Sequence, residues 1–358
     1  MKNILIVTGG SGGHVVPSLN ISDHLSNKFF VKIVSDLRGS KFINKNNYNF
    51  EIVDVPNIFS KFYFFPLKII KYLISIFHSI LFIHRNKIDI LISTGGYMTF
   101  PFCIAAILFK KKIFLFEPNS SLGRSNKIIL KFASKIFCYH SGIDNFPKKY
   151  NFKKVIIDPI LNKEFYKIEK KNNMVKDNFM KLLIIGGSQG ASFFDDKITD
   201  IIVEISKKHK LNIYQQISNK GKIQLIKEKY NRQNIEYKFF NFTNDYKEIF
   251  NEVDLAITRG GAITLSELSF LNIPFIAIPL PTAKDNHQYH NAAFYYKKNC
   301  CWLIEQSRFN KDKVSKIISN IFVNKSDYFD KIRNLKKISE KNIWNNLNNH
   351  IIEIIDEN

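Results

Sequence analysis

Three glycine-rich turns in this chain could hold a phosphate. They are Gly9 to Gly13, Gly186 to Gly190, and Arg259-Gly260-Gly261-Ala262, and each follows an apolar run and precedes a helical pattern. Backbone N–H groups at a helix start carry partial positive charge, which favours phosphate or sugar oxygens. The first turn is not a G-x-G-x-x-G dinucleotide fingerprint, because Val15 stands where the third glycine belongs. Any one turn could serve packing alone, but three turns facing one cleft would make a diphosphate site.

The net charge favours an anionic partner without naming it. Lysine and arginine total 53 against 31 acidic residues, giving a formal net charge of +22. Anionic lipid, nucleic acid and phosphorylated substrate are all compatible with this excess, and so is the compositional drift of an AT-rich genome. The lysines are scattered and form neither a basic recognition helix nor an aromatic-basic RNA motif, which ranks membrane and phosphate above nucleic acid.

The cysteines and the first residues indicate a reducing compartment. Cys103 and Cys138 are far apart and Cys300 and Cys301 are adjacent, so neither CxxC spacing nor a disulfide framework is present. The start at Met1 lacks the apolar core and the cleavage site of a secretory signal. We therefore expect a cytoplasmic fold whose first strand begins at once.

The elements that must position the turns repeat one pattern twice. Apolar runs predict strands at residues 2–8, 31–35, 88–93, 113–116, 136–139 and 154–157, and again at 181–185, 213–216, 235–239, 254–258 and 275–278. The 358 residues and 45% apolar content also exceed what one core usually serves. We predict two doubly wound α/β domains over residues 1–160 and 161–338, with a helix over 339–358 that packs back on the first domain. Residues 167–181 are expected to be a surface loop.

The segment from Phe62 to Ile83 is apolar enough to raise the question of whether it spans a membrane. It is almost wholly apolar, but Lys68, Lys71, Ser75 and His78 recur at three- and four-residue steps. A membrane span would need about 20 apolar residues without such charges. The pattern instead predicts a helix with a polar stripe, which either lies in a membrane interface or packs on the sheet.

Six motifs in order give a more specific resemblance. They are residues 8–17 (TGGSGGHVVP), 93–101 (STGGYMTFP), 116–119 (FEPN), 186–191 (GGSQGA), 259–267 (RGGAITLSE) and 285–292 (DNHQYHNA). This series resembles the MurG family of GT-B glycosyltransferases, in family 28. It departs at Ser11, where threonine is common, and at Phe116 and Pro118 of the family's HEQN turn.

The resemblance implies a GT-B fold, with two Rossmann-like domains facing an interdomain cleft. It also implies an inverting N-acetylglucosaminyltransferase of peptidoglycan synthesis that moves the sugar from UDP-N-acetylglucosamine to the C4 hydroxyl of undecaprenyl-diphosphate-linked N-acetylmuramoyl-pentapeptide. Its expected location is peripheral, on the cytoplasmic face of the cell membrane. The expected partners are the donor, the lipid acceptor, an anionic membrane surface and other wall and division proteins, with no nucleic acid.

The resemblance also assigns the donor-binding residues, and their chemistry agrees with those roles. Glu267 would accept hydrogen bonds from the ribose hydroxyls, whereas an exposed helix cap is the alternative. Ser188 and Thr264 would hold the diphosphate, Gln288 would read sugar hydroxyls, and Thr243 falls where relatives contact uracil through the backbone. The remaining residues of this group are Ala262, Ile263, Leu265 and Ser266 from the second domain, with Ser11, Gly12, Gly13, Tyr97 and Asn119 from the first.

Inverting transfer needs a base, and two residues are candidates. The neutral imidazole of His14 can accept a proton near pH 7 beside the first turn, although it could instead only orient substrate. Glu117 is the second candidate. Helix starts can stabilise the departing UDP, and Asp195-Asp196 falls inside a helix rather than at a strand end, so we expect no essential metal and no cofactor.

One departure and two alternatives remain. Relatives usually have Asn-Pro-Val-Arg after the last strand of the first domain, whereas this chain has Asp158-Pro159-Ile160-Leu161. Lys163 could replace the arginine as a point charge, but it lacks the planar fork, so donor affinity could be lower. The alternatives are a transferase for another lipid acceptor, such as diacylglycerol, and a donor-binding relative without catalysis.

Overall fold

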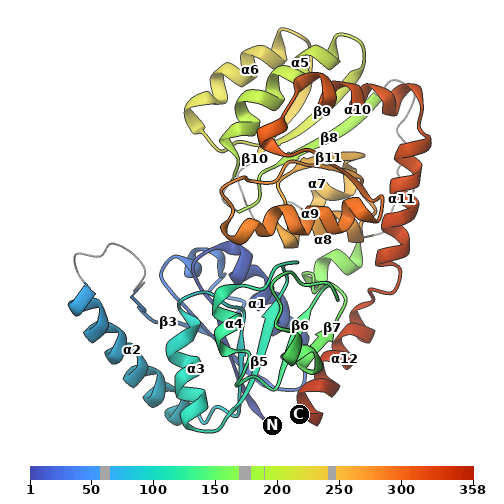
Figure 1. The fold of residues 1–358 in the computed structure, drawn as a ribbon. Coiled ribbons are helices and arrows are strands. Elements are labelled where there is room, and N and C mark those ends of the chain that lie inside the picture. The colour runs from blue at the N-terminus through green and yellow to red at the C-terminus, as the bar shows by residue number, and fades with distance from the viewer. Residues whose placement is uncertain (57–64, 169–178, 189, 241–246) are drawn as a thin grey trace. The chain divides into compact units, whose positions relative to one another are not determined.

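The chain forms two compact units (Figure 1). The computed structural model describes residues 1–56, 65–168, 179–188, 190–240 and 247–358. The first unit comprises Met1–Lys163 together with Ile343–Asn358, and the second comprises Glu164–Asn342. Most of the loop expected at residues 167–181 lies outside the described residues, and β8 begins at Phe179.

A parallel sheet forms the centre of the first unit. Its 7 strands run in the order β3-β2-β1-β4-β5-β6-β7. The strands are β1 (Asn3–Val7), β2 (Phe30–Ser35), β3 (Phe50–Ile52), β4 (Ile90–Ser93), β5 (Lys112–Glu117), β6 (Lys135–Cys138) and β7 (Lys154–Ile156). β1 is the point where the order reverses, since Val7 pairs with Val34 of β2 on one side and with Ser93 of β4 on the other.

Helices cover both faces of this sheet. They are α1 (Gly12–Leu25), α2 (Phe65–Arg85), α3 (Thr99–Leu108), α4 (Arg124–Ile129) and α12 (Trp344–Glu357). Residues of α2, α3 and α4 share one buried cluster, and residues of α1 and α12 share the other. The two faces together bury the parallel strands, as a sheet of this kind requires.

The C-terminal helix α12 belongs to the first unit, whereas the helix that precedes it in sequence, α11, belongs to the second. Leu347, Ile351 and Ile355 recur every four residues and are buried in the cluster that contains α1. Trp344 stacks on His24 of α1 with ring centroids 3.7 Å apart. Burial lowers the pKa of His24 to about 4, so its ring is uncharged at neutral pH.

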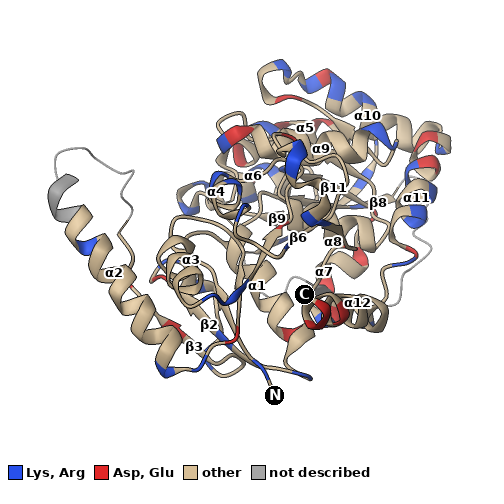
Figure 2. Cartoon of the chain, turned by 60° about the horizontal axis from the view of Figure 1, so that its bottom comes forward, with Lys and Arg blue, Asp and Glu red and all other residues tan. Residues whose placement is uncertain are grey.

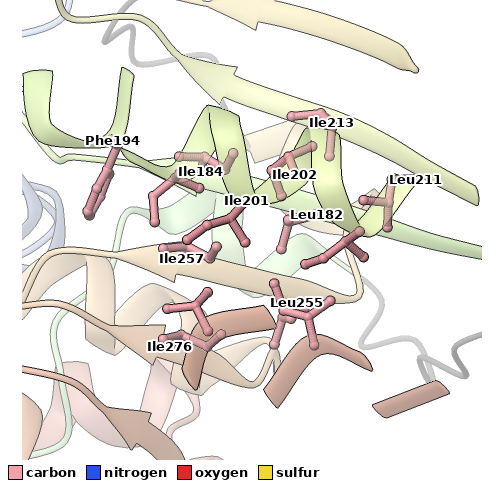
Figure 3. Close-up of a cluster of buried hydrophobic side chains, with 14 of the residues drawn as sticks. Leu182, Ile184, Phe194, Ile201, Ile202, Leu211, Ile213, Leu255, Ile257 and Ile276 are labelled. Carbon is pink, nitrogen blue, oxygen red and sulfur yellow. The ribbon is translucent and has the colours of Figure 1, made fainter. Parts of the chain in front are cut away.

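The second unit repeats the architecture with a 6-stranded parallel sheet in the order β10-β9-β8-β11-β12-β13. The strands are β8 (Phe179–Ile185), β9 (Lys210–Gln216), β10 (Glu236–Phe240), β11 (Leu255–Thr258), β12 (Phe275–Ala277) and β13 (Cys301–Leu303). Leu182 and Ile257 from neighbouring strands pack with Ile201 and Ile202 of α5 in the core (Figure 3). The helices are α5 (Thr199–Ser206), α6 (Ile223–Asn231), α7 (Lys247–Glu252), α8 (Ala262–Phe270), α9 (His287–Lys297), α10 (Lys311–Val323) and α11 (Ser326–Ser339).

Helix α2 agrees with the predicted polar stripe only in part. Lys71 and His78 are exposed, but Ser75 is only 4% exposed and donates to the Lys71 carbonyl of its own helix. Apolar side chains also face outward: Ile69, Ile70, Leu73, Ile74 and Phe77 are 39%, 55%, 59%, 50% and 59% exposed. The side chains of residues 62–68 lie outside the described part. No helix among the described residues is both long and apolar enough to cross a membrane.

Candidate active site

Four of the six sequence motifs lie where the strand order of a sheet reverses, and the motifs at residues 116–119 and 285–292 lie at or after the ends of the adjacent strands β5 and β12. In the first unit the turn after β1 and the loop after β4 meet at the carboxyl ends of adjacent parallel strands. In the second unit the turns after β8 and β11 do the same, because Ile185 pairs with Thr258. Ligands of open α/β sheets bind at such reversal points, so each unit offers one candidate site.

His14 is held beside both glycine loops of the first unit. Its Nδ1 lies 2.8 Å from the carbonyl oxygen of Thr94. A carbonyl can only accept, so Nδ1 carries the proton and the neutral ring has its lone pair on Nε2. The imidazole is therefore fixed in the tautomer that can accept a proton through Nε2.

The second glycine loop of this unit, Gly95-Gly96, leaves room for that ring. Both glycines have left-handed φ values, +87° and +90°. A Cβ on Gly95 would lie 3.6 Å from His14 Cε1, and one on Gly96 would lie 3.8 Å from His14 Cδ2. A residue with a side chain would be strained in this left-handed backbone, and its Cβ would come into van der Waals contact with the imidazole.

Glu117 ends β5 and is saturated with hydrogen bonds. One oxygen accepts from the backbone and side-chain nitrogens of Asn119 at 3.3 and 2.9 Å, and the other accepts from Gly123 N at 2.8 Å and Asn126 Nδ2 at 3.1 Å. Burial raises the pKa of Glu117, and these donors oppose the rise. The carboxylate is 3% exposed. This arrangement suits a residue that orients Asn119 better than one that takes a substrate proton.

Hydrogen bonds also hold Tyr97 and the first glycine turn in place. The Tyr97 hydroxyl donates to Asp36 at 2.7 Å, and burial first, then this bond, raise its pKa to about 12. Ser11 precedes helix α1 as its N-cap, and its carbonyl accepts from His14 N at 3.0 Å. Gly12 and Gly13 form the first turn of α1. The first-unit residues predicted for substrate thus surround the β1–β4 reversal point.

In the second unit, the side chains of Gln216, which ends β9, and of Ser218 just after it hold the turn that follows β8. Gln216 accepts from Gly186 N at 2.8 Å and donates to Gly187 O at 2.9 Å, and Ser218 Oγ accepts from Ala191 N at 2.5 Å. Asp195 in turn accepts from the backbone of Ser218 and Asn219. Ser188 is half-buried at this braced turn.

The turn after β11 is braced from helix α9. Gln288 Oε1 accepts from Leu280 N at 3.0 Å and Gly260 N at 3.3 Å, and Asn291 Nδ2 donates to Gly260 O at 2.9 Å. A Cβ on Gly260 would lie 2.0 Å from the Gln288 carbonyl oxygen, so this position requires glycine. With its Oε1 used in this way, Gln288 would meet a ligand through its Nε2 donor.

Helix α8 begins directly after this turn and carries the predicted donor residues. Ala262, Ile263 and Thr264 in its first turn are half-buried. Leu265 is fully buried and is a packing residue by its side chain, and Ser266 donates to Ala262 O at 2.8 Å. Glu267 is 3% exposed, which rules out the alternative of an exposed helix cap.

Three further positions need comment. Thr243 lies outside the described residues. Leu161, which stands where relatives usually have arginine, is fully buried. Lys163 is exposed and lies over the ring of Trp344 at 5.7 Å, within the first unit.

Several residues that brace the turns were not predicted as site residues. Asp36, Asn126 and Gln216 lie outside the six motifs, whereas Thr94 and Asn291 lie within them, and each contacts a glycine turn or a candidate side chain. One general signal does apply to them, because a polar residue at the carboxyl end of a predicted parallel strand can face the reversal point. Asp36, Thr94 and Gln216 all fit that description.

Arg259, which begins the third glycine turn, is a buried charged residue. Its guanidinium donates to Ile278 O at 2.9 Å and to Gln306 Oε1 at 2.6 Å, and it lies 4.8 Å from the ring centroid of Phe194. Burial lowers its pKa to about 10, so it stays charged at neutral pH. These contacts make it a brace for the third turn.

Known proteins resemble the chain along its whole length. A UDP-N-acetylglucosamine--N-acetylmuramyl-(pentapeptide) pyrophosphoryl-undecaprenol N-acetylglucosamine transferase from Pelagibacter ubique is 46% identical over 357 residues, covering 100% of this chain and 99% of that protein. The protein of the same name from Rickettsia felis is 33% identical and covers 94% and 95%. The crystal structure of Acinetobacter baumannii MurG matches with a TM-score of 0.78 at 21% identity over 100% of both chains.

The match extends to both halves separately. Residues 4–138 match the glycosyltransferase family 28 N-terminal domain, and residues 181–347 match its C-terminal domain. The predicted fold class of two Rossmann-like domains is confirmed, and so is the resemblance read from the six motifs. The chain belongs to glycosyltransferase family 28.

Proposed function

We propose that this protein transfers N-acetylglucosamine from UDP-N-acetylglucosamine to the C4 hydroxyl of undecaprenyl-diphosphate-linked N-acetylmuramoyl-pentapeptide. The observation that carries the proposal is the 46% identity, over the full length, to a protein with that named activity. The imidazole of His14 lies beside two glycine loops in the tautomer that can accept a proton, so it can act as the base for this transfer. The reaction is the inverting step that forms the β-1,4 link of the peptidoglycan disaccharide.

His14 takes the proton of the acceptor hydroxyl as that oxygen attacks the anomeric carbon. The bond from the sugar to the UDP oxygen breaks, and the leaving diphosphate gains negative charge. Backbone N–H groups of the second unit's turns and at the start of α8 stabilise this charge. Glu117 orients Asn119 for the sugar, because their side chains are bonded at 2.9 Å.

Donor recognition falls to the second unit. Ser188 and Thr264 contact the diphosphate, Glu267 accepts from the ribose hydroxyls, and Gln288 donates to the sugar. Ala262, Ile263, Leu265 and Ser266 line the donor through the α8 backbone, and Thr243 contacts uracil. In the first unit Ser11, Gly12, Gly13 and Tyr97 complete the sugar and acceptor side.

An acceptor series tests this function. Purified protein with radiolabelled UDP-N-acetylglucosamine should label the undecaprenyl-diphosphate-muramoyl acceptor and leave diacylglycerol unlabelled. Labelling of diacylglycerol alone would favour the transferase with another lipid acceptor. Donor binding in calorimetry without transfer to any acceptor would favour the non-catalytic relative.

A membrane contact through helix α2 accords with a lipid acceptor. Ile69, Ile70, Leu73, Ile74 and Phe77 form one outward face of α2. The ribbon of this helix is largely tan in Figure 2, since few of its residues are charged. An exposed apolar face of this extent is typical of an interaction site. We propose that it lies in the cytoplasmic surface of the cell membrane, with the excess of lysine and arginine attracting anionic lipid.

Replacing both Leu73 and Phe77 with Asp should weaken binding to vesicles containing phosphatidylglycerol at least about 100-fold, because each apolar side chain that the membrane would bury contributes roughly 1.5–3 kcal/mol. Co-sedimentation with vesicles measures this. Val323→Asp on α10 is the matched control, since Val323 is 83% exposed in the second unit. Unchanged vesicle binding of the double variant would remove α2 from the membrane contact.

EDTA should leave the transfer rate unchanged, because backbone donors rather than a bound ion are proposed to stabilise the departing diphosphate. Among the described residues, no three His, Cys, Asp or Glu side chains gather as a metal site requires. Initial rates with and without chelator measure the effect. Activity that disappears with EDTA and returns with magnesium would contradict this mechanism.

A further inference from the structure

Asp36 directly follows β2 and connects three loops of the first unit. It is 4% exposed. Its Oδ1 accepts from Gly10 N at 2.9 Å and from Gly39 N at 2.7 Å, and its Oδ2 accepts from the Tyr97 hydroxyl at 2.7 Å. These donors come from the loops after β1, β2 and β4, which are the strands at and beside the reversal point.

The backbones around this carboxylate pack without spare room. A Cβ on Gly39 would lie 3.0 Å from Asp36 Oδ1 and 3.1 Å from Gly9 Cα. A Cβ on Gly9 would lie 3.0 Å from the same Asp36 oxygen. The loops are thus built around the carboxylate, and Gly10, at φ +84°, is held in a left-handed conformation by a bond to it.

The carboxylate is charged at neutral pH. Burial alone would raise the pKa of Asp36, but the bonds from Gly10, Tyr97 and Gly39 and the charge of Arg38 outweigh burial and hold the pKa below its usual value. Arg38 lies on the same side, since a Cβ on Gly10 would be 3.2 Å from its Nη2. The charge-assisted bond therefore fixes the Tyr97 phenol more firmly than a neutral partner would.

The loop that Asp36 holds through Tyr97 also forms the wall beside the proposed base. Gly96 directly precedes Tyr97, and a Cβ on Gly96 would lie 3.8 Å from His14 Cδ2 and 3.9 Å from Gly9 O. Asp36 thus restrains the surroundings of His14 on two sides, through Gly10 on one and through Tyr97 on the other.

We propose that Asp36 is a positioning residue for the transfer reaction, which holds Tyr97 and the first glycine turn in the geometry that His14 requires. The inference rests on the proposed function. No proton moves to or from Asp36 in this role, and it acts only through Tyr97 and Gly10. A displacement of about 1 Å at a reacting centre can cost roughly 100-fold in rate, so loss of this brace should be measurable.

The test compares Asp36→Ala, Asp36→Asn and Tyr97→Phe with wild-type protein in the labelled-donor assay. Asp36→Ala should lower turnover about 10- to 100-fold and change donor affinity little in calorimetry, because the proposed diphosphate and ribose contacts belong to the second unit. Asp36→Asn should recover most of the activity, since an amide oxygen can accept from both glycines and its nitrogen can donate to the Tyr97 oxygen. The acidic limb of the rate profile should persist in Asp36→Asn.

A matched control is Asp23→Ala. Asp23 also accepts from a tyrosine hydroxyl, that of Tyr48 at 3.2 Å, but near the other end of α1. This variant should retain wild-type turnover. If Asp36→Ala fails to fold, Tyr97→Phe still tests the inference, because this variant preserves the Asp36 bonds to both glycines. It should lower turnover about fivefold, the order expected for the loss of one hydrogen bond.

Four results would overturn the inference. They are wild-type turnover in Asp36→Ala, wild-type turnover in Tyr97→Phe, equal damage in Asp36→Asn and Asp36→Ala, and fully additive effects when Asp36→Ala and Tyr97→Phe are combined. An inactive wild-type protein would overturn the proposed function, and this inference with it. An active wild-type protein with any of the four results would overturn the inference alone.

Discussion

His14→Ala should lower turnover by about 10²–10⁴, the range typical of losing a general base. The physical reason is the bond from Nδ1 to Thr94 O, which leaves the lone pair of the neutral imidazole on Nε2. The acidic limb of the rate profile should also vanish, because protonation removes that lone pair and alanine has nothing to protonate. Rates over a range of pH at saturating donor and acceptor measure both effects.

Donor affinity should change little in this variant, because the proposed diphosphate contacts belong to the second unit. His350→Ala on α12 is the matched control, since His350 is exposed and distant in sequence from the glycine turns. Near-normal turnover with only a raised Michaelis constant would make His14 a residue that positions substrate. Glu117 would then be the leading base, despite the four bonds that already occupy its two oxygens.

Glu267→Ala should weaken UDP-N-acetylglucosamine binding by about 1–3 kcal/mol, roughly 5- to 150-fold, the scale of a lost charge-assisted hydrogen bond. Glu267 is 3% exposed on helix α8, which begins directly after the turn that Gln288 and Asn291 brace. Calorimetric titration measures the affinity.

The control for this variant is Glu236→Ala at the start of β10, whose carboxylate is 60% exposed beside Lys210. That change should leave donor affinity as in the wild type. An unchanged affinity in a folded Glu267→Ala protein would remove Glu267 from ribose recognition.

The sheets could be predicted because buried parallel strands read as apolar runs that end in glycine turns. Residues 2–8 contain β1, and residues 181–185 end with β8 at Ile185. Most glycines of these turns indicated the reversal points, since Gly10, Gly186, Gly190 and Gly260 occupy positions where a left-handed backbone or a close contact excludes other residues. Local pattern and global fold agree at these points, which is why the motifs were readable.

Two of the four edge strands, β3 and β13, were not predicted from the same pattern, whereas the edge strands β7 and β10 were. β3 (Phe50–Ile52) contains Glu51 and has no buried residue, so it lacks an apolar run. β13 (Cys301–Leu303) is apolar but has only three residues. The final helix was predicted to begin at residue 339, but Ser339 ends α11 and the final helix α12 begins at Trp344. Pairing with a neighbouring strand or helix, rather than local sequence, determines these elements.

The residues that brace the candidate site also could not be predicted from local sequence pattern. Asp36 acts on Tyr97 across 61 positions, and Gln216 acts on Gly186 across 30. Only the parallel pairing of the strands brings such residues together. The types of the catalytic and binding residues follow from the motifs, whereas their orientation follows from the sheet.

The most direct test of the account follows both products of one reaction. Purified protein with UDP-N-acetylglucosamine and undecaprenyl-diphosphate-muramoyl-pentapeptide should release one UDP for each sugar transferred, and the isolated lipid should carry N-acetylglucosamine in a β-1,4 link to the muramoyl unit. An α link, or UDP release without a disaccharide on the lipid, would contradict inverting transfer to the C4 hydroxyl.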